Sequence, residues 1–174
     1  SLNNGSDAFL AYPDTLVVDL ADLPLVPKII GTGLRVDKYF RDSRNPIVLN
    51  FTLNMNSGML WLSFDDIIDQ REVDVTNLGF QNAGDGSADQ LFQLTANDTL
   101  TSTDDGLVMA IQLSTWSMNG IKMLGNLCTQ RSNTYLSVGT SSFRDMAGNM
   151  ITPVNTTAAL GASEFTKDGT KPNV

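Results

Sequence analysis

The stretch Ile47–Phe64, with the sequence IVLNFTLNMNSGMLWLSF, decides the fold class. Its first part carries apolar residues at every second position (Leu49, Phe51, Leu53), and so does its last part (Leu60, Leu62, Phe64). Alternation of this kind places the apolar side chains on one face of a β-strand. The intervening segment Asn54–Gly58 is rich in Asn and Gly, which favour tight turns. The stretch therefore predicts two half-buried strands joined as a hairpin.

Similar patterns continue along the chain. Strands are predicted over 75–81, 90–95, 107–113, 134–138 and 158–166, with polar loops over 82–89 and 96–106. In the run 107–113 the residues expected on the buried face are Leu107, Met109, Ile111 and Leu113. Residues 114–124 predict a short helix, capped by Ser114 or Thr115, whose expected core residues are Trp116, Ile121 and Leu124. Short strands separated by turn signals predict an all-β fold, an antiparallel β-sandwich.

Composition restricts the function. The chain has 174 residues, a net charge of −8 and no histidine. The negative charge argues against nucleic acid and against an anionic membrane surface as partners. Without histidine there is no Ser-His-Asp or Cys-His chemistry, and most zinc, copper and iron sites are also excluded. No apolar run is long enough to cross a membrane. We therefore expect no catalytic residue, no metal site, no cofactor and no enzyme activity.

The chain also repeats itself. Residues 9–46 align with residues 135–172 without a gap: Asp19-Leu20-Ala21 falls on Asp145-Met146-Ala147, and Pro46 falls on Pro172. A long internal period is typical of arrays of like modules. The repeat predicts two parts, an N-terminal extension over 1–45 that is a partial repeat, and a complete module over 46–172. The extension thus duplicates the module's own C-terminal strands.

The module resembles the bacterial-type immunoglobulin-like repeat domains of extracellular surface and adhesin proteins, which also occur in tandem in secreted algal and protist proteins. The residues that carry the resemblance are Pro46, Leu60–Asp65 with Val73-Asp74, Thr134–Val138 and the closing turn Phe143–Asn149. The resemblance implies an immunoglobulin-like sandwich, an extracellular location, and a role as a spacer, adhesive or assembly module. The N-terminal copy has Asp22-Leu23 where Gly148-Asn149 stand, so its turn is expected to be remodelled.

Several positions are candidates for modification or ligand binding. Sequons for N-glycosylation begin at Asn4, Asn50, Asn97 and Asn155. Acidic clusters near Asp65, Asp85 and Asp104 are interpreted as solvated turns, because none has the ligand spacing of a calcium loop. The single cysteine, Cys128, is either a buried apolar residue or a reactive or intermolecular thiol.

The partial repeat suggests an assembly mechanism. Two or three isolated strands are marginal in water, and exposed strand edges seek partners, so the extension is expected to dock on a sheet. The candidate interface residues are Phe9, Leu10, Tyr12, Val17, Ile29, Leu34, Val36, Tyr39 and the outward-facing Trp61. Docking on another copy would be head to tail and would generate a filament, with the chain itself as the partner.

Three functions remain open from the sequence. The first is a structural subunit of an extracellular, glycosylated filament or surface appendage. The second is a piece of a tandem-repeat adhesin or surface-layer protein, in which the extension is the end of the preceding repeat. The third is a carbohydrate-binding module that uses Trp61 or Tyr12.

Overall fold

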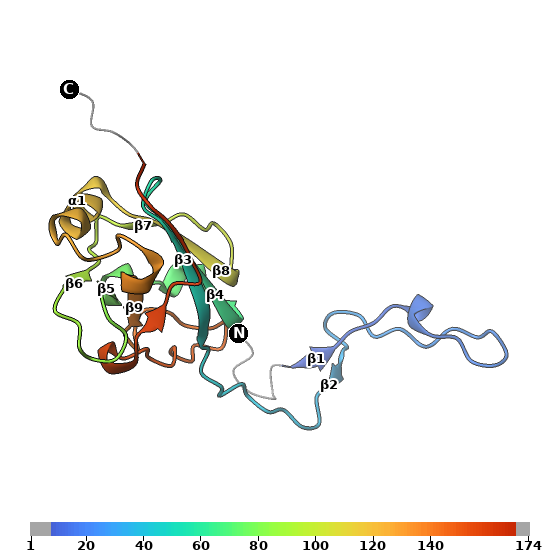
Figure 1. Cartoon of the computed structure of the whole chain (residues 1–174). Helices are drawn as coiled ribbons and strands as arrows, with labels where there is room; N and C mark the ends of the chain where they lie inside the picture. Colours follow the sequence, from blue (N-terminus) through green and yellow to red (C-terminus); the bar gives the residue numbers. More distant parts are fainter. Residues whose placement is uncertain (1–7, 170–174) are drawn as a thin grey trace. The chain divides into compact units, whose positions relative to one another are not determined.

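The computed structural model describes residues 8–169. The chain divides into two units, Ser1–Ser43 and Arg44–Val174, which we call the N-terminal unit and the sandwich module (Figure 1). Each unit is described by itself.

The larger sheet of the sandwich module has five strands in the order β11-β3-β4-β8-β7. Their bounds are Glu164–Thr166 for β11, Val48–Asn54 for β3, Met59–Ile68 for β4, Gly106–Gln112 for β8 and Thr99–Leu100 for β7. The predicted hairpin joins β3 to β4, with Leu53 opposite Leu60. Gly58 has φ 72°, and the Asn54 side chain accepts hydrogen bonds from the backbone of Asn56 and Ser57. Asn and Gly were therefore reliable turn signals here.

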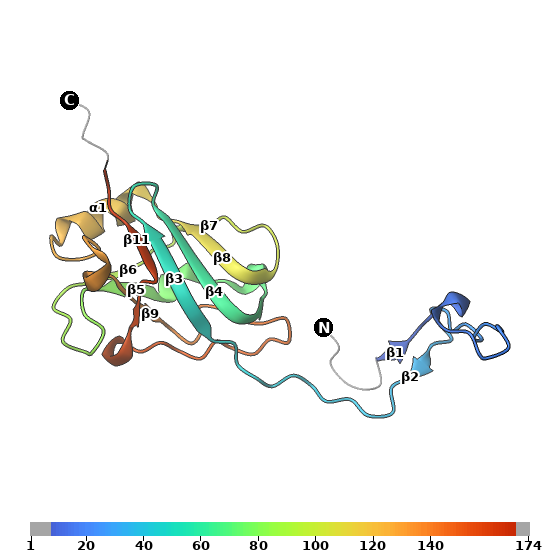
Figure 2. The same cartoon turned by 45° about the vertical axis from the view of Figure 1, so that its right-hand side comes forward.

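The second sheet has four strands in the order β10-β9-β5-β6. Their bounds are Leu160–Gly161 for β10, Tyr135–Val138 for β9, Leu78–Gln81 for β5 and Leu91–Gln93 for β6. Short 3-10 turns precede or follow the strands: Gln70–Glu72, Val75–Asn77, Arg131–Asn133 and Thr156–Ala158. All strand pairs of the module are antiparallel except that of β11, which runs parallel to β3 and lies along it in Figure 2.

The core lies between the two sheets. The larger sheet contributes fully buried side chains such as Phe51, Leu62 and Met109, and the smaller sheet contributes Phe80 and Leu136. The Phe64 and Phe143 rings meet edge to face, with their centroids 4.9 Å apart. Aromatic pairs in this geometry add to the stabilisation that comes from burial. The prediction of an all-β sandwich is confirmed.

Two expected core residues of the strands are instead exposed. Leu49 is 52% exposed, because a register shift between Val48 and Asn50 turns this part of β3 over. A bulge of one residue sends a side chain to the opposite face of a sheet. Leu107 is 51% exposed, although Met109, Ile111 and Leu113 of the same run are buried as predicted.

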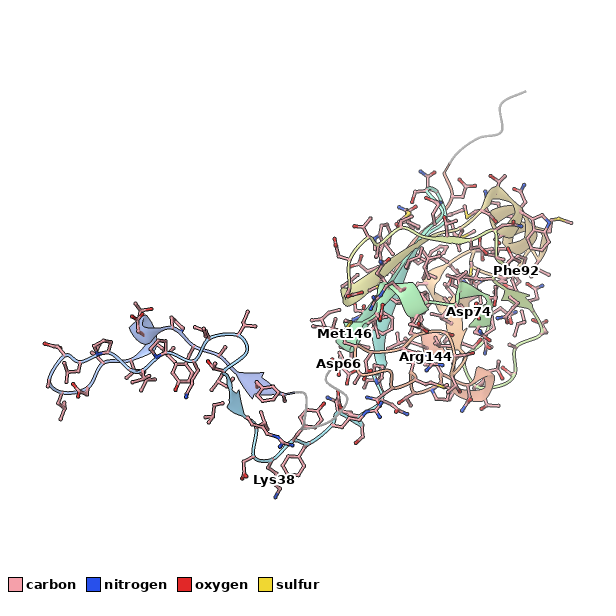
Figure 3. The ribbon with its side chains drawn as sticks, turned by 180° about the vertical axis from the view of Figure 1, so that it is seen from behind. Lys38, Asp66, Asp74, Phe92, Arg144 and Met146 are labelled. Atoms are coloured by element: carbon pink, nitrogen blue, oxygen red, sulfur yellow. The ribbon has the colours of Figure 1, made fainter. Side chains whose placement is uncertain are left out.

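The single helix of the described chain, α1, spans Thr115–Met123 and begins after the expected cap. Ser114 Oγ accepts a hydrogen bond from Ser117 N at 3.1 Å. Ser117 and Ile121, four residues apart on one face, are buried, so Trp116 lies off that face and is 62% exposed. Its ring lies 5.7 Å from that of Phe92, which is labelled in Figure 3. The prediction that Trp116 faces the core was wrong, because the next residue, Ser117, takes that place.

The N-terminal unit is a folded-back ribbon. Strand β1 (Phe9–Leu10) pairs antiparallel with β2 (Leu34–Arg35), and a 3-10 turn covers Asp14–Leu16. Two isolated bridges, Tyr12↔Lys28 and Val18↔Pro24, continue the pairing toward the tip. The unit has little apolar burial of its own, since Ala8 is its one buried apolar residue among those described.

Candidate assembly surface

The N-terminal unit reproduces the backbone pairing of the module's final strands. The matching pairs, N-terminal unit first, are Phe9↔Arg35 with Tyr135↔Gly161, Leu10↔Leu34 with Leu136↔Leu160, Tyr12↔Lys28 with Val138↔Val154, and Val18↔Pro24 with Arg144↔Met150. Individual hydrogen bonds agree as well: Tyr12 N donates to Lys28 O at 2.8 Å, as Val138 N does to Val154 O at 2.9 Å. The gap-free sequence repeat is therefore a repeat of structure.

The closing turn is built in the same way in both copies. In the module, Asp145 Oδ1 accepts hydrogen bonds from the amides of Ala147 and Asn149, both at 2.8 Å. In the N-terminal unit, Asp19 Oδ1 accepts from the amides of the two equivalent residues at 2.8 and 3.0 Å. Asp22 adopts φ 57° where Gly148 has φ 86°. The expected remodelling of this turn does not occur, because Asp tolerates the left-handed region better than most residues do.

The two copies differ in how far their apolar side chains are covered. In the module, Leu136, Phe143 and Ile151 are completely buried. The equivalent residues of the N-terminal unit are exposed: Leu10 by 55%, Val17 by 57% and Leu25 by 41%. The N-terminal unit therefore has the backbone of a module's final strands and shows the face that a module would bury. Contiguous exposed apolar surface on a soluble protein marks an interaction site.

Most of the predicted interface residues belong to this face or its margin. Phe9, Leu10, Val17 and Leu34 are more than half exposed, and Tyr12, Val36 and Tyr39 are half-buried. Their module equivalents are all buried or half-buried. Ile29 differs, because its equivalent in the module is the exposed Asn155. Sequence reasoning missed Leu16 and Leu25, although the alignment itself would have identified Leu25 through the buried Ile151.

Trp61 lies in the module, away from any sheet edge. It stands in β4 opposite Thr52 of β3 and Ala110 of β8, and its side chain is half-buried. Since Leu60 and Leu62 face the core, Trp61 is on the outer face of the five-stranded sheet, as predicted from the alternation.

Three of the four sequon asparagines are exposed: Asn50 in β3, Asn97 in the loop before β7, and Asn155 before β10. Each has the accessibility that attachment of a glycan requires. Asn4 lies outside the described residues.

The acidic residues accept hydrogen bonds, but Asp65 is a half-buried residue of β4, so the prediction of a solvated turn at this cluster was wrong. Asp65 pairs with Arg44 and also accepts from the amide of Ile47. Asp69 accepts from Arg71 through two side-chain bonds and a backbone bond; the side-chain hydrogen bonds contribute most to holding the pKa of Asp69 below its usual value. Hydrogen bonds from Ser87 likewise lower the pKa of Asp85. Carboxylates that are bonded in this way stabilise local loop structure.

Cys128 lies in the core and is 4% exposed. Burial raises the pKa of its thiol to about 12, with a smaller opposing effect from a hydrogen bond to Thr134. Because the thiolate is the reactive form, we interpret Cys128 as a core residue.

A labelling experiment tests this interpretation. At pH 8 a thiol with a pKa near 12 is ionised in roughly one molecule in ten thousand. We expect Ellman's reagent to leave Cys128 unmodified in the native chain and to react with one thiol per chain after unfolding in urea. Rapid reaction of the native protein would contradict the core assignment.

α1 is the single α-helix of the described residues. It is not long and apolar enough to cross a lipid bilayer.

The chain was compared with protein families, curated proteins and solved structures. No protein-family model matches the chain, and no curated protein matches it. A solved structure with a similar fold is the crystal structure of the S-layer protein rSbsC(31-844), at 15% identity and a TM-score of 0.45 over 75% of this chain. The chain spans 14% of the length of that structure. The resemblance to bacterial-type immunoglobulin-like repeats stays a prediction.

Proposed function

We propose that this chain is a structural part of an extracellular assembly of like β-sandwich modules, joined head to tail through the N-terminal unit. One observation carries the proposal: the N-terminal unit has the hydrogen-bond pattern of a module's final strands, and its equivalents of core residues are exposed. A surface of this shape is complementary to the part of a sandwich that final strands normally cover. Strand addition of this kind combines main-chain hydrogen bonds with apolar pockets for alternate side chains.

The linear form of the assembly follows from the position of the unit. The N-terminal unit precedes the module, and the strands that it resembles end the module. Each joint therefore links the end of one module to the beginning of the next. A contact between two different surfaces generates an open array, unless the rotation from one module to the next happens to close a ring. The array is either a filament of separate subunits or a polypeptide of tandem modules, and both are structural functions.

Electron microscopy of the native material, with its glycans retained, tests the proposal. We expect linear arrays whose repeating body is one sandwich module, because every module presents one such joint at each end. Isolated particles the size of a single module would contradict the proposed function.

Limited proteolysis of the same material tests the surface itself. Lys28 and Arg35 are trypsin sites within the N-terminal unit, and covering the unit should protect both of them. In the native assembly we expect trypsin to leave these bonds intact for much longer than in the isolated chain. The substitution Leu10→Asp should abolish the protection by placing a charge in the joint, whereas Leu20→Asp, at a fully exposed tip residue, should preserve it. Equal cleavage of the native material and the isolated chain would show that the unit is uncovered.

A further inference from the structure

We infer that the partner of the N-terminal unit is the first half of a like sandwich module, a segment similar to residues 44–133 that leads directly into Ala8 in the same polypeptide. The inference rests on the proposed function and deepens it by naming the partner and its register. It is carried by three contacts that the module's final strands make with its first half, each of which transfers onto the N-terminal unit.

The first contact is a strand pairing. In the module, the second neighbour of β9 is β5, with Phe80 opposite Leu136 and Gln81 opposite Tyr135. The equivalents of Tyr135 and Leu136 are Phe9 and Leu10, on the edge of β1 away from β2. A strand like Leu78–Gln81 would thus extend the ribbon of β1 and β2 into a three-stranded sheet. Its apolar side chains would cover Leu10 as Phe80 and its neighbours cover Leu136.

The second contact involves a glycine loop. Gly84 lies against the Tyr135 ring, so closely that a Cβ on this glycine would come within 2.7 Å of Tyr135 Cε1. Ala159 N also donates to Gly84 O at 2.9 Å. The equivalents of Tyr135 and Ala159 are Phe9 and Gly33, and these two residues line an apolar hollow of about 250 Å³ in the N-terminal unit, together with Ala11, Ile29, Ile30 and Gly31. The hollow lies where the glycine loop of a first half would fit.

The third contact forms a strand that the N-terminal unit lacks. In the module, β11 pairs parallel with β3, and its central residue Phe165 packs against the core. The equivalents of β11 are residues 38–40, which have no strand structure here. Lys38 (labelled in Figure 3) instead places its ammonium 5.0 Å from the Phe40 ring centroid. Binding of a first half would convert residues 38–40 into a strand and would place Tyr39 where Phe165 packs against the core of the module.

A complete module is a poor source of the partner, because its own final strands compete for the surface that the N-terminal unit would cover. Residues 44–133 of a second copy are already covered by their own residues 134–169, which are tethered to them at high effective concentration. The N-terminal unit therefore needs a first half that has no final strands of its own. In the module, the turn Arg131–Asn133 leads directly into Thr134 and β9. A half placed before Ala8, the equivalent of Thr134, would be tethered to the unit in the same way and would have no final strands of its own to compete.

Side-chain volumes show that this partner differs from residues 44–133 in detail. Tyr12 stands where the module has the buried Val138, and Leu16 stands where it has the buried Ser142. In compensation, the smaller Val17 replaces Phe143. Because overpacking a core destabilises it, the partner must have more room beside Tyr12 and Leu16 than this module offers. Such differences would also keep each half paired with its own complement.

A hybrid chain tests the inference. Residues 44–133 replace residues 1–7, directly before Ala8 of the chain, in two versions. One version keeps the natural N-terminal unit, and the other carries Tyr12→Val, Leu16→Ser, Val17→Phe and Val36→Ala, which restore the module's own core residues. A control, in which residues 134–169 replace residues 8–43, is a plain duplication of the module.

The readout is amide hydrogen exchange at Val26, Gly33 and Asp37. Their module equivalents Thr152, Ala159 and Ser163 donate to the carbonyls of Pro46, Gly84 and Phe51, which all belong to the first half. We expect these amides to exchange about 100-fold more slowly in the hybrid than in the natural chain, at least in the version with restored core residues. Protection in either version supports the inference, and exchange at the natural chain's rate in both versions would overturn it. That second result would leave linear arrays in the native material unaffected, so it is distinct from failure of the proposed function.

Discussion

Leu136→Ala is expected to lower the free energy of unfolding of the sandwich module by about 2–5 kcal/mol, since Leu136 is completely buried between the sheets. Leu10→Ala, the same change at the equivalent place in the N-terminal unit, is expected to change it by less than about 0.5 kcal/mol. Leu10 is 55% exposed in the chain described here and leaves no cavity when it is truncated. The two leucines share residue type, strand register and backbone pairing, and they differ in burial and in the unit to which they belong.

Urea unfolding followed by tryptophan fluorescence measures both variants. Both tryptophans, Trp61 and Trp116, lie in the sandwich module, so the signal reports on that unit. Leu20→Ala, at a fully exposed residue, serves as the control for a leucine truncation without structural effect. A cost for Leu10→Ala as large as that for Leu136→Ala would mean that the N-terminal unit is already covered in the isolated chain.

The second large effect is expected at the closing turn. Asp145 is 2% exposed, and its carboxylate accepts hydrogen bonds from the backbone N–H groups of Ala147 and Asn149 and from the Asn149 side chain. Asp145→Ala would remove the carboxylate that accepts from the backbone N–H groups of Ala147 and Asn149, which are half-buried. We expect a loss of about 1–3 kcal/mol in the free energy of unfolding, because a donor that loses its acceptor away from bulk water carries a desolvation penalty of this size.

The equivalent substitution provides the matched comparison. Asp19 makes the same two backbone hydrogen bonds but is exposed, so water can replace its oxygens in Asp19→Ala. We expect that variant to leave the unfolding midpoint of the module unchanged in differential scanning calorimetry. Asp145→Asn, which retains one acceptor oxygen, should fall between the native chain and Asp145→Ala. If Asp145→Ala unfolds at the native temperature, the turn does not depend on this carboxylate.

Much of the local structure was predictable because its causes are local. The turn over Asn54–Gly58 that joins β3 to β4, the Ser114 cap of α1 and the alternating strands all depend on residues within a few positions of each other. Errors arose where a side chain's direction depends on backbone register or helical phase. Alternation places Leu49 on the buried face, because it does not reveal the bulge between Val48 and Asn50. Trp116 was assigned to the core on its apolar character, whereas Ser117 and Ile121 occupy the inward face of α1.

Residues of the candidate surface were predictable from the sequence, but the structural match between the two copies was not. The gap-free alignment identified Leu10 and Val17, since an apolar position that recurs in two copies marks a shared structural role. It did not show that both copies form the same bridges and the same turn, and the change from Gly148 to Asp22 even suggested otherwise. Backbone conformation at a turn depends on its complete set of hydrogen bonds, and Asp19 supplies those bonds whatever residue follows.

The sequence by itself determined the all-β class, the repeat and its register, and the absence of histidine chemistry. These properties follow from composition and from the spacing of side chains along the chain. Only the tertiary structure decided which copy of the repeated strands packs on a core and which copy leaves its apolar side chains exposed. Leu10 and Leu136 are the same residue in the same pairing, and they differ because β5 lies beside Leu136 in the module, whereas Leu10 is left exposed. Burial is a property of what lies across the sheet, and strands distant in the sequence supply it.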